Sequence, residues 1–245
     1  LGDVYKRQLQ LGVATVKAHK HKQSAVVIEN VKCIADFAAS LPFELTNAQK
    51  RVINEISADL KNSVPMNRLV QGDVGSGKTI VAAASMFAVA KSGYQSVMMA
   101  PTEILAEQHF AGLKKYFEPW GIKVAFLSGG QKAKERRENL ELIESGEASV
   151  IVGTHAVITD KVNFANLALS ITDEQHRFGV SQRTKLAGKG INSHTLVMTA
   201  TPIPRTLSLV IYGDLDISII DQLPPGRKEI KTIACLLYTS PSPRD

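Results

Sequence analysis

One short stretch constrains what this chain can fold into and what it can bind. Residues 69–79 read LVQGDVGSGKT, which fits the pattern G-x-x-x-x-G-K-[ST]. An apolar run precedes the pattern and an alanine-rich helix pattern follows it, so the sequence predicts a strand–loop–helix unit. Glycines let main-chain N–H groups approach phosphate oxygens, and the helix N-terminus adds unpaired donors. We therefore expect the loop to bind the phosphates of ATP. Its residues are Gly72, Asp73, Val74, Gly75, Ser76, Gly77, Lys78 and Thr79.

A magnesium ion has candidate ligands in two places. We expect Lys78 to reach the β- and γ-phosphates and the Thr79 hydroxyl to bind Mg²⁺. Asp173 and Glu174 follow the apolar run 167–172. We expect Asp173 to hold the metal from the end of a strand adjacent to the loop strand, and Glu174 to orient and deprotonate the attacking water. The alternatives are a glycine-rich turn without a ligand and an ordinary acidic pair.

Further polar residues lie near these motifs. Gln175 and His176 directly follow the acidic pair, and we expect them to sense the γ-phosphate and to pair with residues 199–201. His109, His155 and His194 show no partner pattern, and we interpret them as structural or surface residues.

Strand and helix patterns alternate along the chain. This alternation, with continuous apolar strands, predicts an α/β P-loop fold with a parallel sheet covered by helices on both faces. A helical segment over residues 9–40, in two pieces joined near residues 23–24, is expected to precede it. The predicted strands are 68–70, 95–100, 122–127, 149–152, 167–172, 194–199 and 215–220, and the later helices are 48–61, 80–90, 104–117 and 131–145.

Composition excludes several classes of protein. The net charge of +6 is compatible with a polyanionic partner but does not establish one. Two cysteines far apart give neither a disulfide framework nor a metal site. No apolar run is long enough to span a membrane and no signal peptide is visible, so we expect a cytoplasmic protein without a membrane partner.

Both ends of the sequence fit no periodicity. Residues 1–8 and 235–245 resemble translated adapter sequence, and we interpret them as non-native, with genuine disordered termini as the alternative. Residues 9–40 are then expected to be a helical linker segment and residues 41–223 one nucleotide-binding domain. Residues 224–234 are expected to begin a link to a further domain, which makes this chain an internal piece of a longer protein.

Five motifs together resemble the motor of superfamily 2 helicases, and more narrowly the RecG family. They are GDVGSGKT (72–79), APTEILAEQH (100–109), GTHAV (153–157), DEQHRFGV (173–180) and TATPIPRT (199–206). The motor of transcription-repair coupling factors shares some of these patterns and is the nearest alternative. A small P-loop kinase lacks support because no lid is evident. A binding module without turnover lacks support because the catalytic residues are present.

The resemblance implies roles for further residues. Phe43 and Gln49 match the adenine-recognising Q-motif, whereas the residues alone favour a core Phe and a helix-surface Gln. The remaining matches are Asp173, Glu174, Gln175 and His176 with motif II, Thr199, Ala200 and Thr201 with motif III, Pro101, Thr102, Gly129 and Thr154 with DNA-backbone motifs, and Arg205 with a stretch that couples ATPase activity to movement.

The resemblance also implies an activity and partners. RecG-like proteins are monomers that use ATP and Mg²⁺ to remodel branched or forked DNA, including stalled forks and Holliday junctions. The family's wedge domain and second RecA-like domain, which carries the arginine finger, have no counterpart in this sequence. From this sequence alone we expect ATP·Mg²⁺ binding with little turnover, since arginine fingers contribute on the order of 10³-fold or more to hydrolysis.

Overall fold

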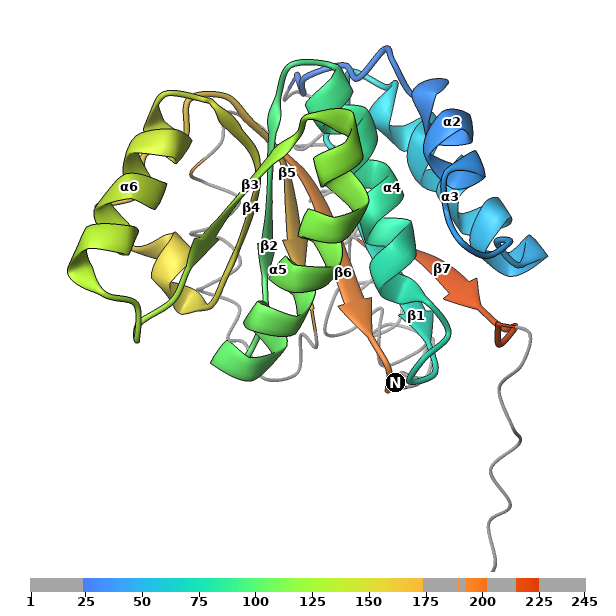
Figure 1. The fold of residues 1–245 in the computed structure, drawn as a ribbon. Helices are drawn as coiled ribbons and strands as arrows, with labels where there is room; N and C mark the ends of the chain where they lie inside the picture. The colour runs from blue at the N-terminus through green and yellow to red at the C-terminus, as the bar shows by residue number, and fades with distance from the viewer. Residues whose placement is uncertain (1–23, 174–188, 190–192, 202–214, 225–245) are drawn as a thin grey trace, which may run out of the picture.

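A parallel sheet forms the centre of the molecule in the computed structural model, which describes residues 24–173, 189, 193–201 and 215–224 (Figure 1). Its order is β3-β4-β2-β5-β6-β1-β7, and all the neighbouring strands pair in parallel. The predicted α/β class and strand positions are confirmed. The strands are β1 (Asn67–Gly72), β2 (Gln95–Met99), β3 (Lys123–Leu127), β4 (Ala148–Gly153), β5 (Leu167–Thr172), β6 (His194–Thr199) and β7 (Asp216–Ile220).

Helices cover both faces of this sheet, as predicted. Neighbouring strand residues point to opposite faces, so Met98 packs in the core beneath the helices between residues 33 and 117, whereas Val97 and Met99 pack in the core beneath the helix over residues 133–144. In the described part of the chain, no helix is long and apolar enough to cross a membrane. The helices are α2 (Cys33–Ala39), α3 (Asn47–Leu60), α4 (Lys78–Lys91), α5 (Glu103–Phe117) and α6 (Ala133–Glu144), with short 3₁₀ turns η1 (Glu118–Trp120) and η2 (His155–Ile158).

The central helix α4 is buried on all sides. Every side chain from Ile80 to Val89 is buried, because α4 lies between the sheet and the helices α2, α3 and α5. This explains why its sequence is apolar all round rather than along one stripe. The Phe37 ring of α2 stacks on the Phe87 ring of α4 at 5.0 Å between centroids. The packing fixes α4, and with it the loop that precedes α4.

The segment before α3 differs from its prediction. Residues 24–30 are not helical, and helix appears only at α2, so the predicted second helical piece is wrong over its first half. The Ala25 and Ile28 N–H groups donate to the carbonyls of Ser63 and Leu60, at 2.6 and 2.9 Å, which ties this β-branched segment to the end of α3 and the residues after it. The first predicted piece lies outside the described residues.

The hydrophobic core runs across the predicted domain boundary at residue 41. Ile28, Ile34 and Phe37 are buried in the same core as α3 and α4. Residues 28–37 therefore belong physically to the folded unit, while the division of the rest of the chain into domains stays a prediction.

The sheet order also corrects the predicted neighbour of the loop strand. Asp173 follows β5, and β6 lies between β5 and β1, pairing with both. The strand that precedes Asp173, β5, is thus not adjacent to β1, the strand that precedes the phosphate loop. Both strands still end at the same edge of the sheet, because all of them run in parallel.

Candidate functional site

The loop between β1 and α4 has the backbone that its glycines permit. Gly75 and Gly77 have φ angles of 78° and 86°, in the left-handed region that residues with a Cβ atom rarely adopt. The Ser76 N–H donates to the Asp73 carbonyl at 3.0 Å, which closes a turn. Gly77 is the N-cap of α4, so the first N–H groups of that helix open towards the loop. This is an anion-binding arrangement of main-chain donors.

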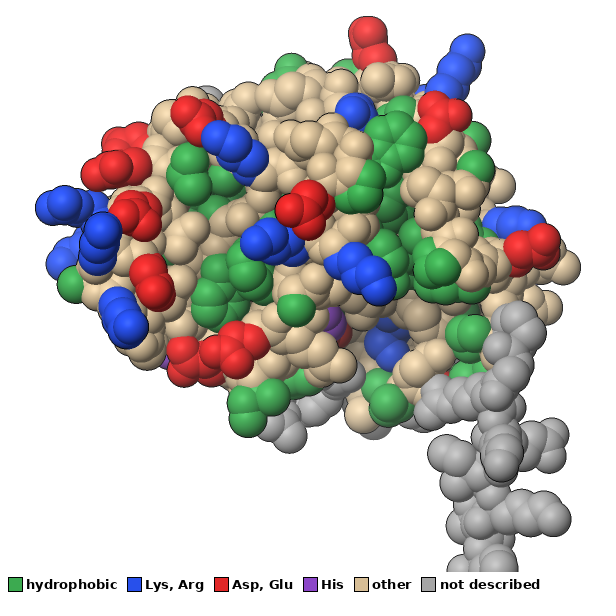
Figure 2. Space-filling view, viewed as in Figure 1, with side chains coloured by type: hydrophobic (Ala, Val, Ile, Leu, Met, Phe, Trp, Pro, Cys, Tyr) green, Lys and Arg blue, Asp and Glu red, His purple; other side chains and the backbone are tan. Residues whose placement is uncertain are grey.

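A cavity of about 220 Å³ opens at this loop, lined by Val74, Gly75, Gly77, Lys78, Thr79 and Asp173. Lys78 and Asp173 are 9% and 8% exposed, so both charges lie in a largely dry site. The Lys78 ammonium donates to the carbonyls of Gly72 at 2.6 Å and Asp73 at 3.0 Å. In Figure 2, histidine, acidic and basic side chains meet in a hollow between the lower ends of α4 and α5.

The donor set of this cavity suits a magnesium–phosphate group. Hydroxyl and carboxylate oxygens are ligands that Mg²⁺ takes alongside phosphate oxygens and waters, and an ammonium suits phosphate. Thr79 and Asp173 bring these oxygens to one cavity from distant parts of the chain. Glu174, Gln175 and His176, for which we predict roles beside it, lie outside the described residues.

Gln49 holds the phosphate loop in place through a hydrogen bond to its main chain. Its side chain is 2% exposed, and its Nε2 donates to the Ser76 carbonyl at 2.9 Å. Its Oε1 accepts from the Thr46 N–H at 2.9 Å, which completes a capping box at the start of α3. A Cβ at Gly77 would lie 2.2 Å from the Gln49 Nε2, so a side chain there would collide with this support. Pairing of Gln49 with an adenine edge stays a prediction.

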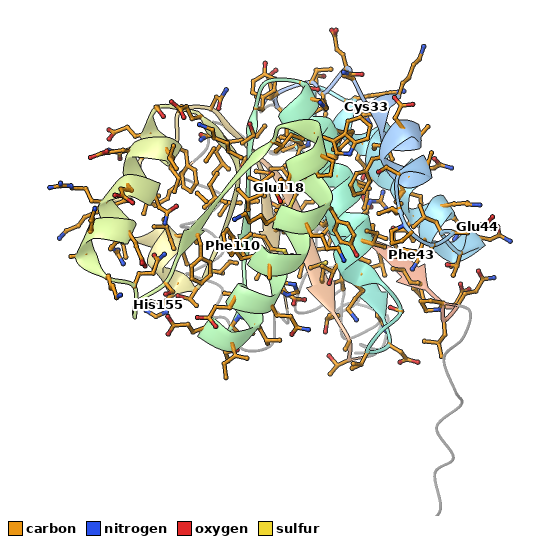
Figure 3. The ribbon with its side chains drawn as sticks, in the orientation of Figure 1. Cys33, Phe43, Glu44, Phe110, Glu118 and His155 are labelled. Carbon is orange, nitrogen blue, oxygen red and sulfur yellow. The ribbon has the colours of Figure 1, made fainter. Side chains whose placement is uncertain are left out.

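Phe43 lies apart from this support. It is 44% exposed, on the α2–α3 side of the molecule (Figure 3). It lines a second cavity of about 500 Å³ together with Pro42, Leu45 and Lys50. Phe43 is therefore exposed and Gln49 is buried, the reverse of the core Phe and helix-surface Gln that the residues alone favour. Stacking of Phe43 on a base stays a prediction.

The residues with predicted DNA contacts line the other half of the same sheet edge. Thr102 follows β2, Gly129 follows β3 and Thr154 follows β4. The Thr102 Oγ1 accepts from the Leu105 N–H at 3.3 Å and so caps α5. The Thr154 hydroxyl is buried, and no described residue hydrogen-bonds it. Pro101 precedes Thr102 and is half-buried, and Arg205 lies outside the described residues.

Thr199 and Thr201 lie at the end of β6, between the strand that precedes Asp173 and the strand that precedes the phosphate loop. Their hydroxyls are 2.9 Å apart, and the Thr201 N–H donates to the Thr199 Oγ1 at 3.2 Å, so Thr199 to Thr201 form one small hydrogen-bonded turn with Ala200 between them. Because β6 separates β5 from β1, this turn flanks both Asp173 and the phosphate loop.

His109, interpreted as a structural or surface residue without a partner pattern in the sequence, has a partner in the structure. Its Nε2 lies 2.8 Å from the Asp173 Oδ2, and both side chains are 11% exposed. A signal existed in the sequence, since Ala106 and Leu113 flank His109 at helical spacing and are buried, which turns this face of α5 inward.

The other two interpreted histidines are confirmed as surface and structural residues. His155 is exposed in η2, below α6 (Figure 3). His194 is buried at the start of β6, where its Nδ1 accepts from the Met66 N–H at 3.0 Å and its Nε2 donates to the Val26 carbonyl at 2.7 Å. Burial lowers the pKa of His194, against the smaller opposing effects of the Val26 carbonyl and the Asp59 charge.

Comparison with known sequences points to helicases. The model of the family described as DEAD/DEAH box helicase matches residues 46–210. The chain is 57% identical over 196 residues to the ATP-dependent DNA helicase RecG of Bacillus subtilis (strain 168), covering 80% of this chain and 29% of that protein. It is 53% identical over 227 residues to RecG of Aquifex aeolicus (strain VF5), covering 92% of this chain and 28% of that protein. The chain thus spans under a third of these two relatives' lengths.

Solved structures agree in fold. The structure of RecG bound to a three-way DNA junction is 44% identical, with a TM-score of 0.79, and the match covers 91% of this chain and 30% of that one. The UvsW helicase from bacteriophage T4 is 14% identical with a TM-score of 0.58, covering 80% of this chain and 69% of that one. Because the sequence identity to UvsW is only 14%, this second likeness supports the RecA-like helicase fold and nothing more.

Proposed function

Because this chain belongs to the DEAD/DEAH box helicase family, we propose that it is the first RecA-like motor domain of an ATP-dependent DNA helicase. The proposed activity is ATP-driven remodelling of branched DNA. Identity above 50% to two RecG helicases supports this, as does likeness to the structure of RecG bound to a three-way DNA junction.

The observation that carries the proposal is the shared cavity of Lys78, Thr79 and Asp173. In the proposed site, the loop N–H groups and the Lys78 ammonium bind the β- and γ-phosphates, while the Thr79 hydroxyl and the Asp173 carboxylate hold Mg²⁺. When bound, Mg²⁺ neutralises charge on the phosphates. Burial of Lys78 and Asp173 strengthens these interactions, since water screens them less. Glu174 is the proposed group that orients and deprotonates water.

The proposed DNA side is the half of the sheet edge that carries Thr102, Gly129 and Thr154. Thr102 follows the strand next to β5, which brings this half directly beside the proposed nucleotide half. Exposed main chain at Gly129 suits a phosphate backbone, which small residues let approach closely.

Equilibrium binding of a fluorescent ATP analogue to the 245-residue chain tests the nucleotide site. We expect binding that Mg²⁺ tightens and EDTA weakens. Steady-state ATP hydrolysis with and without forked DNA is the second measurement, and we expect little turnover and no unwinding by this chain. Absence of Mg²⁺-dependent nucleotide binding would overturn the proposed function, and robust DNA-stimulated turnover would overturn the expected inactivity.

A further inference from the structure

We propose that His109 is a positioning residue that orients the Asp173 carboxylate for magnesium binding. The inference rests on the proposed function, in which Asp173 is a metal ligand. It starts from the 2.8 Å contact between the His109 Nε2 and the Asp173 Oδ2, which joins helix α5 to the end of strand β5. Both side chains are 11% exposed, so water competes little for this contact.

The chemistry of the two groups assigns the proton. An ionised carboxylate only accepts hydrogen bonds, so the ring nitrogen at this distance is the donor and His109 carries its proton on Nε2. A hydrogen bond to one carboxylate oxygen fixes the rotation of the whole group, and this decides where the other oxygen points. Carboxylates that bind metals are commonly oriented by such hydrogen bonds from residues that do not touch the metal.

The surroundings make the contact rigid at both ends. The Asp173 main chain is fixed because its N–H donates to the Met99 carbonyl of β2 at 2.9 Å. His109 is fixed because Ala106 and Leu113, on the same face of α5, are fully buried. The hydrogen bond from His109 therefore restrains the rotation of the Asp173 carboxylate between two fixed backbones.

The contact also joins the two halves of the sheet edge. Thr102, in the half with proposed DNA contacts, caps the helix that carries His109. Asp173 belongs to the nucleotide half. His109 therefore provides a direct physical link between α5 and the proposed metal ligand.

Two amide variants of similar polarity test the role. A Gln amide nitrogen occupies about the position of a histidine Nε2, whereas an Asn amide nitrogen corresponds to Nδ1 and falls short of Asp173. The measurement is a Mg²⁺ titration of the EDTA-treated 245-residue chain with a bound fluorescent ATP analogue, with thermal unfolding of each variant as the folding check. His155→Asn, on an exposed histidine of η2, is the matched control.

We expect His109→Asn to weaken Mg²⁺ affinity by about 10- to 100-fold, the range found when such orienting partners are removed. Nucleotide affinity in EDTA should stay near wild type, and His109→Gln and His155→Asn should keep wild-type Mg²⁺ affinity. Wild-type Mg²⁺ affinity in His109→Asn would overturn the inference, as would equal losses in the Asn and Gln variants, or an equal loss of nucleotide affinity with and without Mg²⁺. If the wild-type chain itself shows no Mg²⁺-dependent binding, the proposed function falls and the inference falls with it, whereas the other outcomes leave the proposed function standing.

Discussion

The carboxyl edge of the sheet divides into two halves that are built differently. In the nucleotide half, at the ends of β5, β6 and β1, a buried lysine and a buried aspartate line one cavity, and a glycine-rich loop with left-handed residues surrounds it. In the half at the ends of β2, β3 and β4, where we propose DNA contacts, the groups in question are the Thr102 hydroxyl, the exposed main chain of Gly129 and the buried Thr154 hydroxyl.

The difference reflects the size of the proposed ligands. A triphosphate is small and highly charged, so its site needs converging donors in one enclosed place. A DNA backbone is long and repetitive, so single weak contacts spread over several strand ends suffice to position it. We therefore expect single substitutions in the nucleotide half to change nucleotide binding sharply, and single substitutions in the other half to change it little.

The largest expected effect is that of Lys78→Ala. A hydrogen bond from a charged group contributes about 1.5–3 kcal/mol, so loss of the Lys78 ammonium should weaken ATP binding by about 10- to 100-fold or more. Lys134→Ala, with a side chain 85% exposed on α6, is the control and should bind like wild type. Fluorescent ATP-analogue titration of both variants is the measurement, and equal affinities would contradict the assignment of Lys78 to phosphate binding.

The second effect concerns two glycines that share a backbone conformation. Gly77 and Gly93 have φ angles of 86° and 83°, so alanine at either position costs about 1–2 kcal/mol of stability for the strained backbone. At Gly77 the new Cβ would also lie 2.2 Å from the Gln49 Nε2, whereas at Gly93 nothing lies within 4 Å. We expect Gly77→Ala to weaken nucleotide binding, by less than Lys78→Ala does, and Gly93→Ala to keep it.

Urea unfolding and ATP-analogue titration of both variants separate the two causes. A further change of Gln49→Ala in the Gly77→Ala background should recover part of the lost stability, because it removes the colliding group. Equal nucleotide affinity in the two glycine variants would show that the contact with Gln49 has no part in shaping the loop.

A smaller effect is expected for Thr102→Ala, in the other half. The Thr102 hydroxyl caps α5 by accepting from the Leu105 N–H, so its loss should cost about 1 kcal/mol of stability. Thr102→Ser keeps the hydroxyl and should restore most of that stability. Both variants should bind the ATP analogue within about twofold of wild type, and a tenfold loss in Thr102→Ala would show that the two halves are not separate.

The nucleotide half was the more predictable from sequence for a physical reason. Its loop is contiguous, so Gly72 to Thr79 carry the whole backbone pattern in one stretch, and the strands were predictable because buried parallel strands read as continuous apolar runs. The place of β6 between β5 and β1 was not predictable from local patterns, because strand order depends on long-range pairing. The contact of His109 with Asp173 was missed for the same reason, since it joins residues far apart in the chain.

The smallest expected effect concerns His194. This residue lies at the amino ends of the strands, opposite the carboxyl edge that carries both halves, so its substitution should leave nucleotide binding unchanged. His194 stands at the amino end of β6, and burial lowers its pKa below the ordinary 6.5. The unfolded chain therefore binds a proton at His194 in a pH range where the folded chain does not. The contribution of His194 to the free energy of unfolding is therefore present above pH 6.5 and is lost as the pH falls below it. One such histidine accounts for at most about 0.8 kcal/mol between pH 7.5 and 6.

Urea unfolding of wild type and His194→Gln across this pH range measures the effect. The relevant quantity is the difference in slope between the two proteins, and we expect the variant to lose less stability as the pH falls. ATP-analogue affinity should not change in the variant at pH 7.5, since His194 donates to Val26 and accepts from Met66, away from both halves of the carboxyl edge. An identical slope in His194→Gln and wild type would show that the buried ring is not the source of the pH dependence.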